Sequence, residues 1–211
     1  NNANGVKDMG ETGVANQLVN IMPGNNFVTT DINGVYHHYF LDSTITYAIT
    51  GPSINFYNQT SAAVVSCHPL TQSCSNIDFG YQAITGIHDM AIQTPLTPVR
   101  PGTNEIFNIL YRNQGSGIES DTITFIMDPL YSFVSAIPNP MSVNGQVIKW
   151  LYNNLQPFQH STIQLTLECS ASAVMGTYLN STLHIGHAND TVPVNNEVIL
   201  NQLVVNSFDP N

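Results

Sequence analysis

The chain has 211 residues and a formal net charge of −10, and its cations are Lys7, Arg100, Arg112 and Lys149. So few cations cannot neutralise a run of phosphates, which argues against nucleic acid and against an anionic membrane surface as partners. No apolar run approaches the roughly 20 residues needed to span a bilayer, which argues against membrane insertion. A 42% share of hydrophobic residues with only 9% charged residues favours a folded, β-rich protein.

The first eleven residues follow the spacing of an acidic cation-binding loop. An EF-hand-type calcium loop places oxygen ligands at loop positions 1, 3, 5, 7, 9 and 12 and a glycine at position 6. With Gly5 as that glycine, the ligands are Asn2, Asn4, the Val6 carbonyl, Asp8 and Glu11. Position 1 falls before Asn1, so the pattern predicts that the chain is a piece of a longer protein.

Alternating apolar and polar residues predict strands throughout the first part of the chain. These strands are expected at 14–22, 27–30, 35–41, 45–50, 62–66 and 76–81. Turn-forming residues separate them, and Asn33-Gly34 is the strongest signal for a hairpin. His37 and His38 are adjacent on the strand expected at 35–41, so they point to opposite faces and cannot chelate one metal together.

The three cysteines differ in their surroundings. Cys67 and Cys74 flank a hairpin-like stretch that contains Pro69, and a disulfide between them would close a short ring worth about 2.5 kcal/mol. The alternatives are two reduced thiols or a metal pair, and the metal pair lacks a second Cys or His pair nearby, His68 excepted. Cys169 lies in an alternating run, which favours a buried free thiol.

A second set of strands begins near His88. They are expected at 88–93, 105–113, 121–128, 131–137, 146–152, 161–169, 177–185 and 197–205. Trp150, the only tryptophan, is interpreted as a core anchor. Two sets of seven or eight strands with Gly, Pro and Asn turns predict an all-β protein of two tandem β-sandwich domains, at residues 1–84 and 85–211. A single glycine, Gly86, in the connector predicts restricted motion between the domains.

Three motifs of the first half, NGVKDMGETG, TTDINGVYHHYF and TYAIT, resemble the calcium-binding B-type domain of bacterial surface adhesins. Those domains are prealbumin-like sandwiches, and the match covers roughly residues 1–83. The resemblance implies a Ca²⁺ shell made by Asn2, Asn4, Val6, Asp8 and Glu11. Asp31 reads either as part of this site or, as we favour, as ordinary turn chemistry.

The second half carries PVRPGTNEIFNILYRNQGS, VIKWLYNNLQP and the closing SFDPN. These segments resemble the Ig-like repeat domain of long surface proteins that Gram-negative bacteria export by type IX secretion, with a match over roughly 86–211. The resemblance implies O-glycosylation at Asp-Ser/Thr triplets, which gives Ser43, Thr122 and Thr191 as candidate acceptors of a glycoprotein. The alternative is that the triplets are ordinary polar turns or strand starts.

No common catalytic motif occurs in the sequence: GxSxG, HExxH, the P-loop and GxGxxG are all absent. Paired carboxylates for glycosidase chemistry can be remote in sequence, and that alternative stays open. His184 and His187 are three residues apart in HIGH, but a stretch that reads as strand and turn argues against a shared metal. The sequence therefore predicts a protein that is not an enzyme.

The expected function is a structural module pair of a large secreted cell-surface fibre, stalk or adhesin, stiffened by calcium. Its expected partners are neighbouring domains of the same chain, further copies in a fibre, or a surface glycan or protein. One alternative is a set of accessory domains of a secreted hydrolase. Another is a glycan-binding module that uses Tyr36, Tyr39 and Tyr57.

Overall fold

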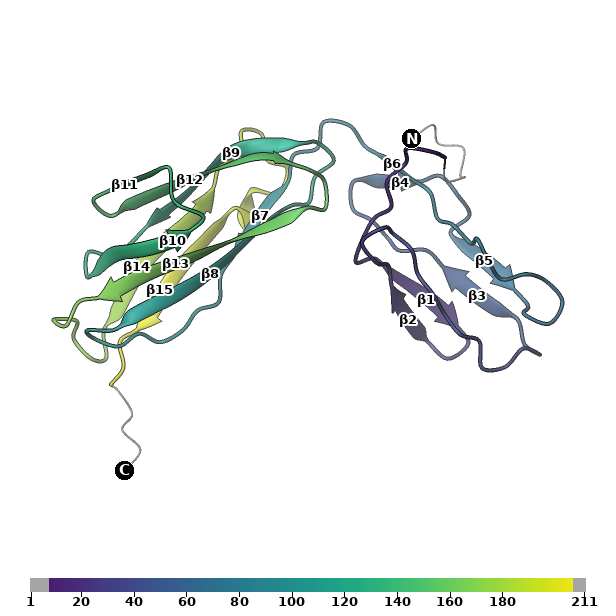
Figure 1. Ribbon diagram of the computed structural model, residues 1–211, viewed down its shortest axis with the longest axis horizontal. Coiled ribbons are helices and arrows are strands. Elements are labelled where there is room, and N and C mark those ends of the chain that lie inside the picture. Colours follow the sequence, from purple (N-terminus) through teal and green to yellow (C-terminus); the bar gives the residue numbers. More distant parts are fainter. Residues whose placement is uncertain (1–7, 207–211) are drawn as a thin grey trace, which may run out of the picture. The chain divides into compact units, whose positions relative to one another are not determined.

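The computed structural model describes residues 8–206 and divides the chain into two compact units between Thr85 and Gly86 (Figure 1). We call them unit 1 and unit 2; the sequence places the boundary one residue earlier, between 84 and 85. Within the described residues every element is a strand except a 3-10 turn at Pro193–Asn195, so the all-β prediction is confirmed. A helix long and apolar enough to cross a bilayer was not found over this range.

Unit 1 is built on an antiparallel sheet in the order β2-β1-β3-β5, and a second, small sheet pairs β4 with β6. The bounds are β1 (Leu18–Met22), β2 (Asn26–Thr29), β3 (Tyr47–Thr50), β4 (Tyr57–Gln59), β5 (Val64–Cys67) and β6 (Tyr81–Ala83). Alternation buries Val19 and Ile21 of β1 and Tyr47 and Ile49 of β3. Together with Cys67 these side chains form the unit 1 core.

The strand predicted at 35–41 is wrong, because this segment belongs to none of the strands in the described part of the chain. Its side chains do alternate: Tyr36 and Phe40 are half-buried against the unit 1 core, while Tyr39 is exposed. The Asn33-Gly34 turn forms, closed by a 2.9 Å bond from the Gly34 N–H to the Asp31 carbonyl, but it does not join two strands. Apolar alternation reports which side chains face the core, not whether another backbone lies at ladder distance.

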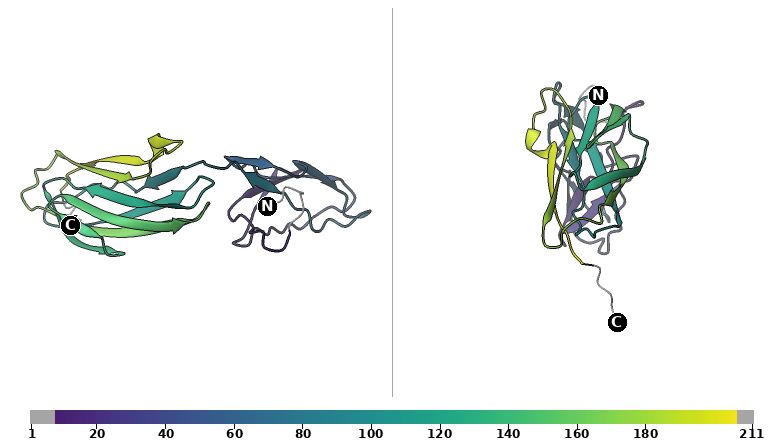
Figure 2. Two further views of the ribbon diagram at one scale, coloured as in Figure 1. Left: turned by 90° about the horizontal axis from the view of Figure 1, so that it is seen from above. Right: turned by 90° about the vertical axis from the view of Figure 1, so that its left-hand side faces the viewer.

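Unit 2 is a sandwich of two antiparallel sheets, in the orders β10-β13-β8-β7 and β11-β12-β9-β14-β15 (Figures 1 and 2). The first sheet contains β7 (Met90–Gln93), β8 (Asn104–Asn113), β10 (Tyr131–Ile137) and β13 (His160–Cys169). The second contains β9 (Glu119–Ile126), β11 (Ser142–Asn144), β12 (Val147–Leu155), β14 (Tyr178–Ile185) and β15 (Glu197–Leu203). All the long strands expected in this half are present, with small shifts in their ends.

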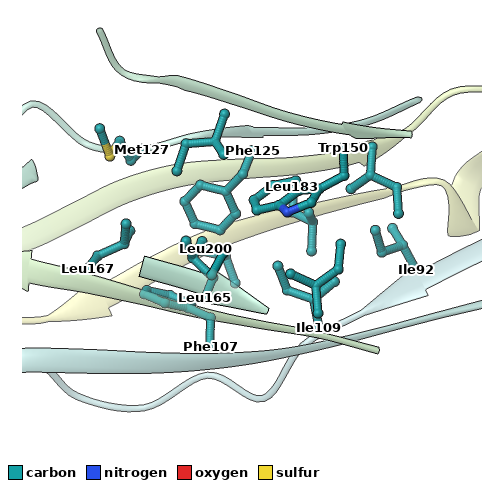
Figure 3. Packing of buried hydrophobic residues seen from close by; sticks show 14 of the residues in the cluster. Ile92, Phe107, Ile109, Phe125, Met127, Trp150, Leu165, Leu167, Leu183 and Leu200 are labelled. Atoms are coloured by element: carbon teal, nitrogen blue, oxygen red, sulfur yellow. The ribbon is translucent and has the colours of Figure 1, made fainter. Parts of the chain in front are cut away.

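The inward side chains of the two sheets meet in one apolar core (Figure 3). Phe107 of β8 and Leu165 of β13 face Phe125 of β9, and the rings of Phe107 and Phe125 pack edge to face with centroids 5.4 Å apart. Trp150 of β12 is 2% exposed, and its Nε1 donates to the Pro138 carbonyl at 3.1 Å. Its predicted role as a core anchor is confirmed. Cys169 is a buried free thiol in β13.

Candidate functional site

The described part of the predicted calcium loop contains Asp8 and Glu11, while Asn2, Asn4 and Val6 lie outside the described residues. The two described residues close a reciprocal turn. The Glu11 N–H donates to the Asp8 carbonyl, and the Asp8 N–H donates to Glu11 Oε2, both at 3.1 Å. The turn places two carboxylates within one loop, and carboxylate and carbonyl oxygens are the ligands that calcium prefers, so this donor set fits the ion.

A close backbone contact fixes the end of this loop against the turn that contains Asn33, in the same unit. A Cβ atom at Gly13 would lie 1.8 Å from the carbonyl oxygen of Asn33, so only glycine allows the approach. The buried Thr30 strengthens the contact, because its hydroxyl donates to the Val14 carbonyl at 2.7 Å and accepts the Gln17 N–H at 2.9 Å. The motifs at 4–13 and 29–40 therefore come into contact through Gly13 and Asn33.

Asp31 takes part in the turn that follows. Its Oδ1 accepts the backbone N–H groups of Asn33 and Val35, each at 2.8 Å. These are the bonds of an aspartate that caps its own turn, which is the role we favour for Asp31 from the sequence.

Cys67 and Cys74 are joined by a disulfide, with their Cα atoms 5.6 Å apart. Cys67 is the last residue of β5 and is 1% exposed in the unit 1 core. The turn between the two cysteines is closed by the N–H groups of Thr71 and Gln72, which both donate to the His68 carbonyl at 3.0 Å. The bridge therefore ties a core strand to the segment that follows it.

The three candidate glycosylation sites differ in accessibility. Ser43 lies exposed in a turn, and Thr191 is exposed in the loop between β14 and β15. Thr122 is half-buried inside β9, and its hydroxyl donates to Asp121 Oδ1 at 3.2 Å. Two of the three hydroxyl groups are therefore open to a modifying enzyme in the folded protein.

The tyrosines considered for glycan binding have different environments. The Tyr36 hydroxyl donates to the Ile77 carbonyl at 2.7 Å, and burial and the charge of Asp78 raise the pKa of Tyr36 to about 12. Tyr57 is half-buried in β4, and Tyr39 is exposed. Tyr36 is thus engaged with the core of unit 1 rather than presented to a ligand.

A cluster in unit 2, which we call the His–Glu–His cluster, joins His88, Glu119 and His187. His88 Nδ1 lies 2.8 Å from Glu119 Oε1, and His187 Nε2 lies 2.5 Å from Glu119 Oε2. The two imidazole rings are stacked, with centroids 4.5 Å apart and planes at 20°. Glu119 is only 2% exposed, whereas the side chain of His88 is 36% exposed and that of His187 is 14% exposed. The cluster therefore combines a buried carboxylate with a solvent-accessible edge.

The histidine pair suggested by the HIGH motif does not form this cluster. His184 is exposed on β14 opposite Glu197 of β15, whereas His187 follows the strand and turns toward Glu119. The expectation that His184 and His187 do not share a metal agrees with this arrangement, but the partners that His187 does have are missed by sequence reasoning.

Glu119 and two further carboxylates, Asp121 and Asp190, act electrostatically on the nearby Tyr152. Burial raises the pKa of Tyr152, and the charges of Asp121, Glu119 and Asp190 raise it further. Burial also raises the pKa of Asp89, although a hydrogen bond from Asn195 lowers it in part. Burial is the larger cause of both shifts, and the neighbouring carboxylates add to it.

No family model and no curated protein sequence matches this chain. Solved structures do match at low sequence identity. The major pilin subunit of Bacillus cereus is 11% identical, with 94% of this chain and 66% of that chain covered and a TM-score of 0.42. Domains 4 and 5 of the S-layer protein SbsC are 12% identical, with 95% and 99% covered and a TM-score of 0.36.

Unit-sized matches are also found. A chain from a type I cohesin–dockerin complex of Clostridium thermocellum is 17% identical, covers 56% of this chain and 99% of its own length, and has a TM-score of 0.40. The likeness is one of general architecture. The chain is similar to β-sandwich modules of pilin, S-layer and cohesin proteins, and these scores say nothing of its ligands or partners.

Proposed function

We propose that this chain is a non-enzymatic structural module pair of a secreted cell-surface fibre, stalk or adhesin, and that calcium stiffens unit 1. The observation that carries the proposal is the reciprocal turn of Asp8 and Glu11, fixed to unit 1 by the contact between Gly13 and Asn33. An ion held by this turn would hold the chain segment that leads into the first sheet.

Two further observations support a structural role outside the cell. The chain forms two compact units that are consecutive in sequence, with unit 1 ending at Thr85 and unit 2 beginning at Gly86, as suits modules in a long chain. The disulfide between Cys67 and Cys74 suits an oxidising compartment, because cytosolic thiols are normally kept reduced.

The calcium shell would comprise the amide oxygens of Asn2 and Asn4, the Val6 carbonyl and the carboxylates of Asp8 and Glu11. Two amides in place of carboxylates lower the charge of the site, so we expect weak affinity, with a Kd of about 10⁻⁴–10⁻³ M. Calcium at about 10 to 100 times its Kd would then stabilise unit 1 by roughly 1.4–2.7 kcal/mol through mass action.

The test is calorimetric melting in calcium and in chelator, on the chain extended by an aspartate before Asn1 to supply loop position 1. Calcium should raise the midpoint of unit 1 by several degrees. The transition of unit 2, followed by the fluorescence of Trp150, serves as an internal control. A Glu11→Gln variant should lose most of the shift. Identical unit 1 midpoints in calcium and in chelator would contradict the proposal.

A further inference from the structure

The His–Glu–His cluster has the donor set of a transition-metal site. Two imidazole nitrogens and one carboxylate oxygen are ligands that zinc accepts, with a fourth position left for water. The three ligand atoms all lie within 4.8 Å of one another. Tetrahedral zinc with bonds of about 2.0–2.2 Å needs ligand atoms about 3.3 Å apart, which small side-chain rotations reach from this arrangement.

The charge balance of the cluster favours a cation. Glu119 is 2% exposed, and a buried carboxylate is costly unless a positive group compensates it. Asp121 and Asp190 add negative potential at the same end of unit 2. A divalent ion between Glu119 and the two neutral imidazoles would compensate this charge directly.

His187 lacks the contacts of a histidine with a purely structural role. Its Nδ1 is buried and makes no hydrogen bond within the described residues, whereas its Nε2 contacts Glu119 Oε2. A buried imidazole that is satisfied on one side gains little from that position as a packing residue. A metal bond at Nε2 would stabilise the imidazole ring of His187 in this position.

The backbone around the cluster is already fixed. The Thr191 N–H donates to the His88 carbonyl at 2.7 Å, and the Met90 N–H donates to Asp190 Oδ2 at 2.8 Å. The loop after β8 packs closely against the segment that carries His88. A Cβ at Gly115 would lie only 2.6 Å from the Ile87 carbonyl oxygen. A site that is held by such contacts needs little reorganisation when an ion binds.

We propose that His88, Glu119 and His187 bind a divalent transition-metal ion of the zinc type, with water as the remaining ligand. The 36% exposed side chain of His88 provides the route for the ion and the water. The ligands come from three places: His88 precedes β7 of one sheet, while Glu119 begins β9 and His187 follows β14 of the other. The ion would therefore link the two sheets of unit 2. This site is independent of the calcium loop in unit 1.

The test is zinc titration by calorimetry, together with the visible absorption of bound cobalt(II), on the untagged 211-residue chain. We expect one ion per chain at unit 2 with a Kd of micromolar or below, and a zinc-dependent rise in the melting midpoint reported by Trp150. His187→Ala and Glu119→Gln should each weaken binding at least 100-fold. His88→Ala changes a more exposed residue, so it tests the same ligand set where a Glu119 variant fails to fold.

The matched control is His184→Ala, which removes an exposed imidazole from β14 and should leave zinc affinity unchanged. Calcium should leave the Trp150 midpoint unchanged, which separates this site from the proposed calcium loop. The proposal is overturned if the chain binds zinc no more tightly than the His187→Ala variant. It is equally overturned if the melting midpoint reported by Trp150 changes with pH but does not change when zinc is added.

Discussion

The buried side-chain amide of Asn113 organises the loop between β8 and β9, which leads to Glu119 of the His–Glu–His cluster. Asn113 is 1% exposed, and its Nδ2 donates to the carbonyls of Gly117 and Leu155 at 2.7 and 2.8 Å. Its Oδ1 accepts the Gly115 N–H at 2.9 Å. These three bonds hold the residues between β8 and β9, and Glu119 is the first residue after them.

Replacing Asn113 with alanine should therefore destabilise unit 2 by about 2–4 kcal/mol, because buried carbonyl and N–H groups lose their partners. It should also weaken zinc binding about 10-fold or more, as expected when a group that positions a ligand is removed. Urea denaturation followed by Trp150 fluorescence measures the first effect and zinc titration the second.

The control is Asn108→Ala, at an exposed position of the same strand, which should change stability by less than about 0.5 kcal/mol. Equal urea midpoints for the Asn113→Ala variant and the unaltered protein would show that this amide does not support the loop.

At the scale of elements, sequence patterning predicts the strands of unit 2 better than those of unit 1. β8 and β13 each run for ten residues with regular burial of alternate side chains, so the periodic signal is long. β11 is exposed at all three positions and β4 is only three residues long, so neither carries an apolar pattern, and both are missed. In residues 35–41 the alternation is real, but the ladder partner is absent from the described part of the chain.

The same reasoning explains which site residues the sequence indicates. The proposed calcium ligands follow from local spacing, so one short segment suffices to predict them. The His–Glu–His cluster is assembled from three distant segments, and no spacing rule connects them. One signal was available: Glu119 lies in phase with Ile123 and Phe125, so alternation places a carboxylate on the core side of β9.

The disulfide gives a prediction at the scale of the elements that it joins. Reducing the bond, or replacing Cys67 and Cys74 with alanine, frees the segment after β5 and should destabilise unit 1 by about 2.5 kcal/mol, as the loop-entropy model gives for a ring of this length. Calorimetric melting with and without reductant measures the change. The disulfide lies in unit 1, so the melting midpoint of unit 2 should not change. A unit 1 midpoint that is insensitive to reductant would contradict the stabilising role of the bridge.

At the scale of the whole molecule, the division at Thr85 and Gly86 leaves each unit with a core of its own. Residues 86–211 should therefore fold alone, because the apolar core of unit 2 is contained in them. The isolated unit should show the Trp150 emission and melting midpoint of the full chain. Fluorescence-detected melting of both proteins makes the comparison, and a broad transition or a red-shifted emission in the isolated unit would show that it depends on unit 1.

The buried thiol of Cys169 can be used to detect separation of the two sheets of unit 2. Cys169 is 0% exposed in β13, which lies between β10 and β8, and burial raises the pKa of its thiol. Alkylating reagents reach such a sulfur atom only after the sheets separate. If the proposed role at a cell surface puts the chain under tension, the rate of Cys169 labelling would therefore measure how readily the sandwich of unit 2 opens under that force.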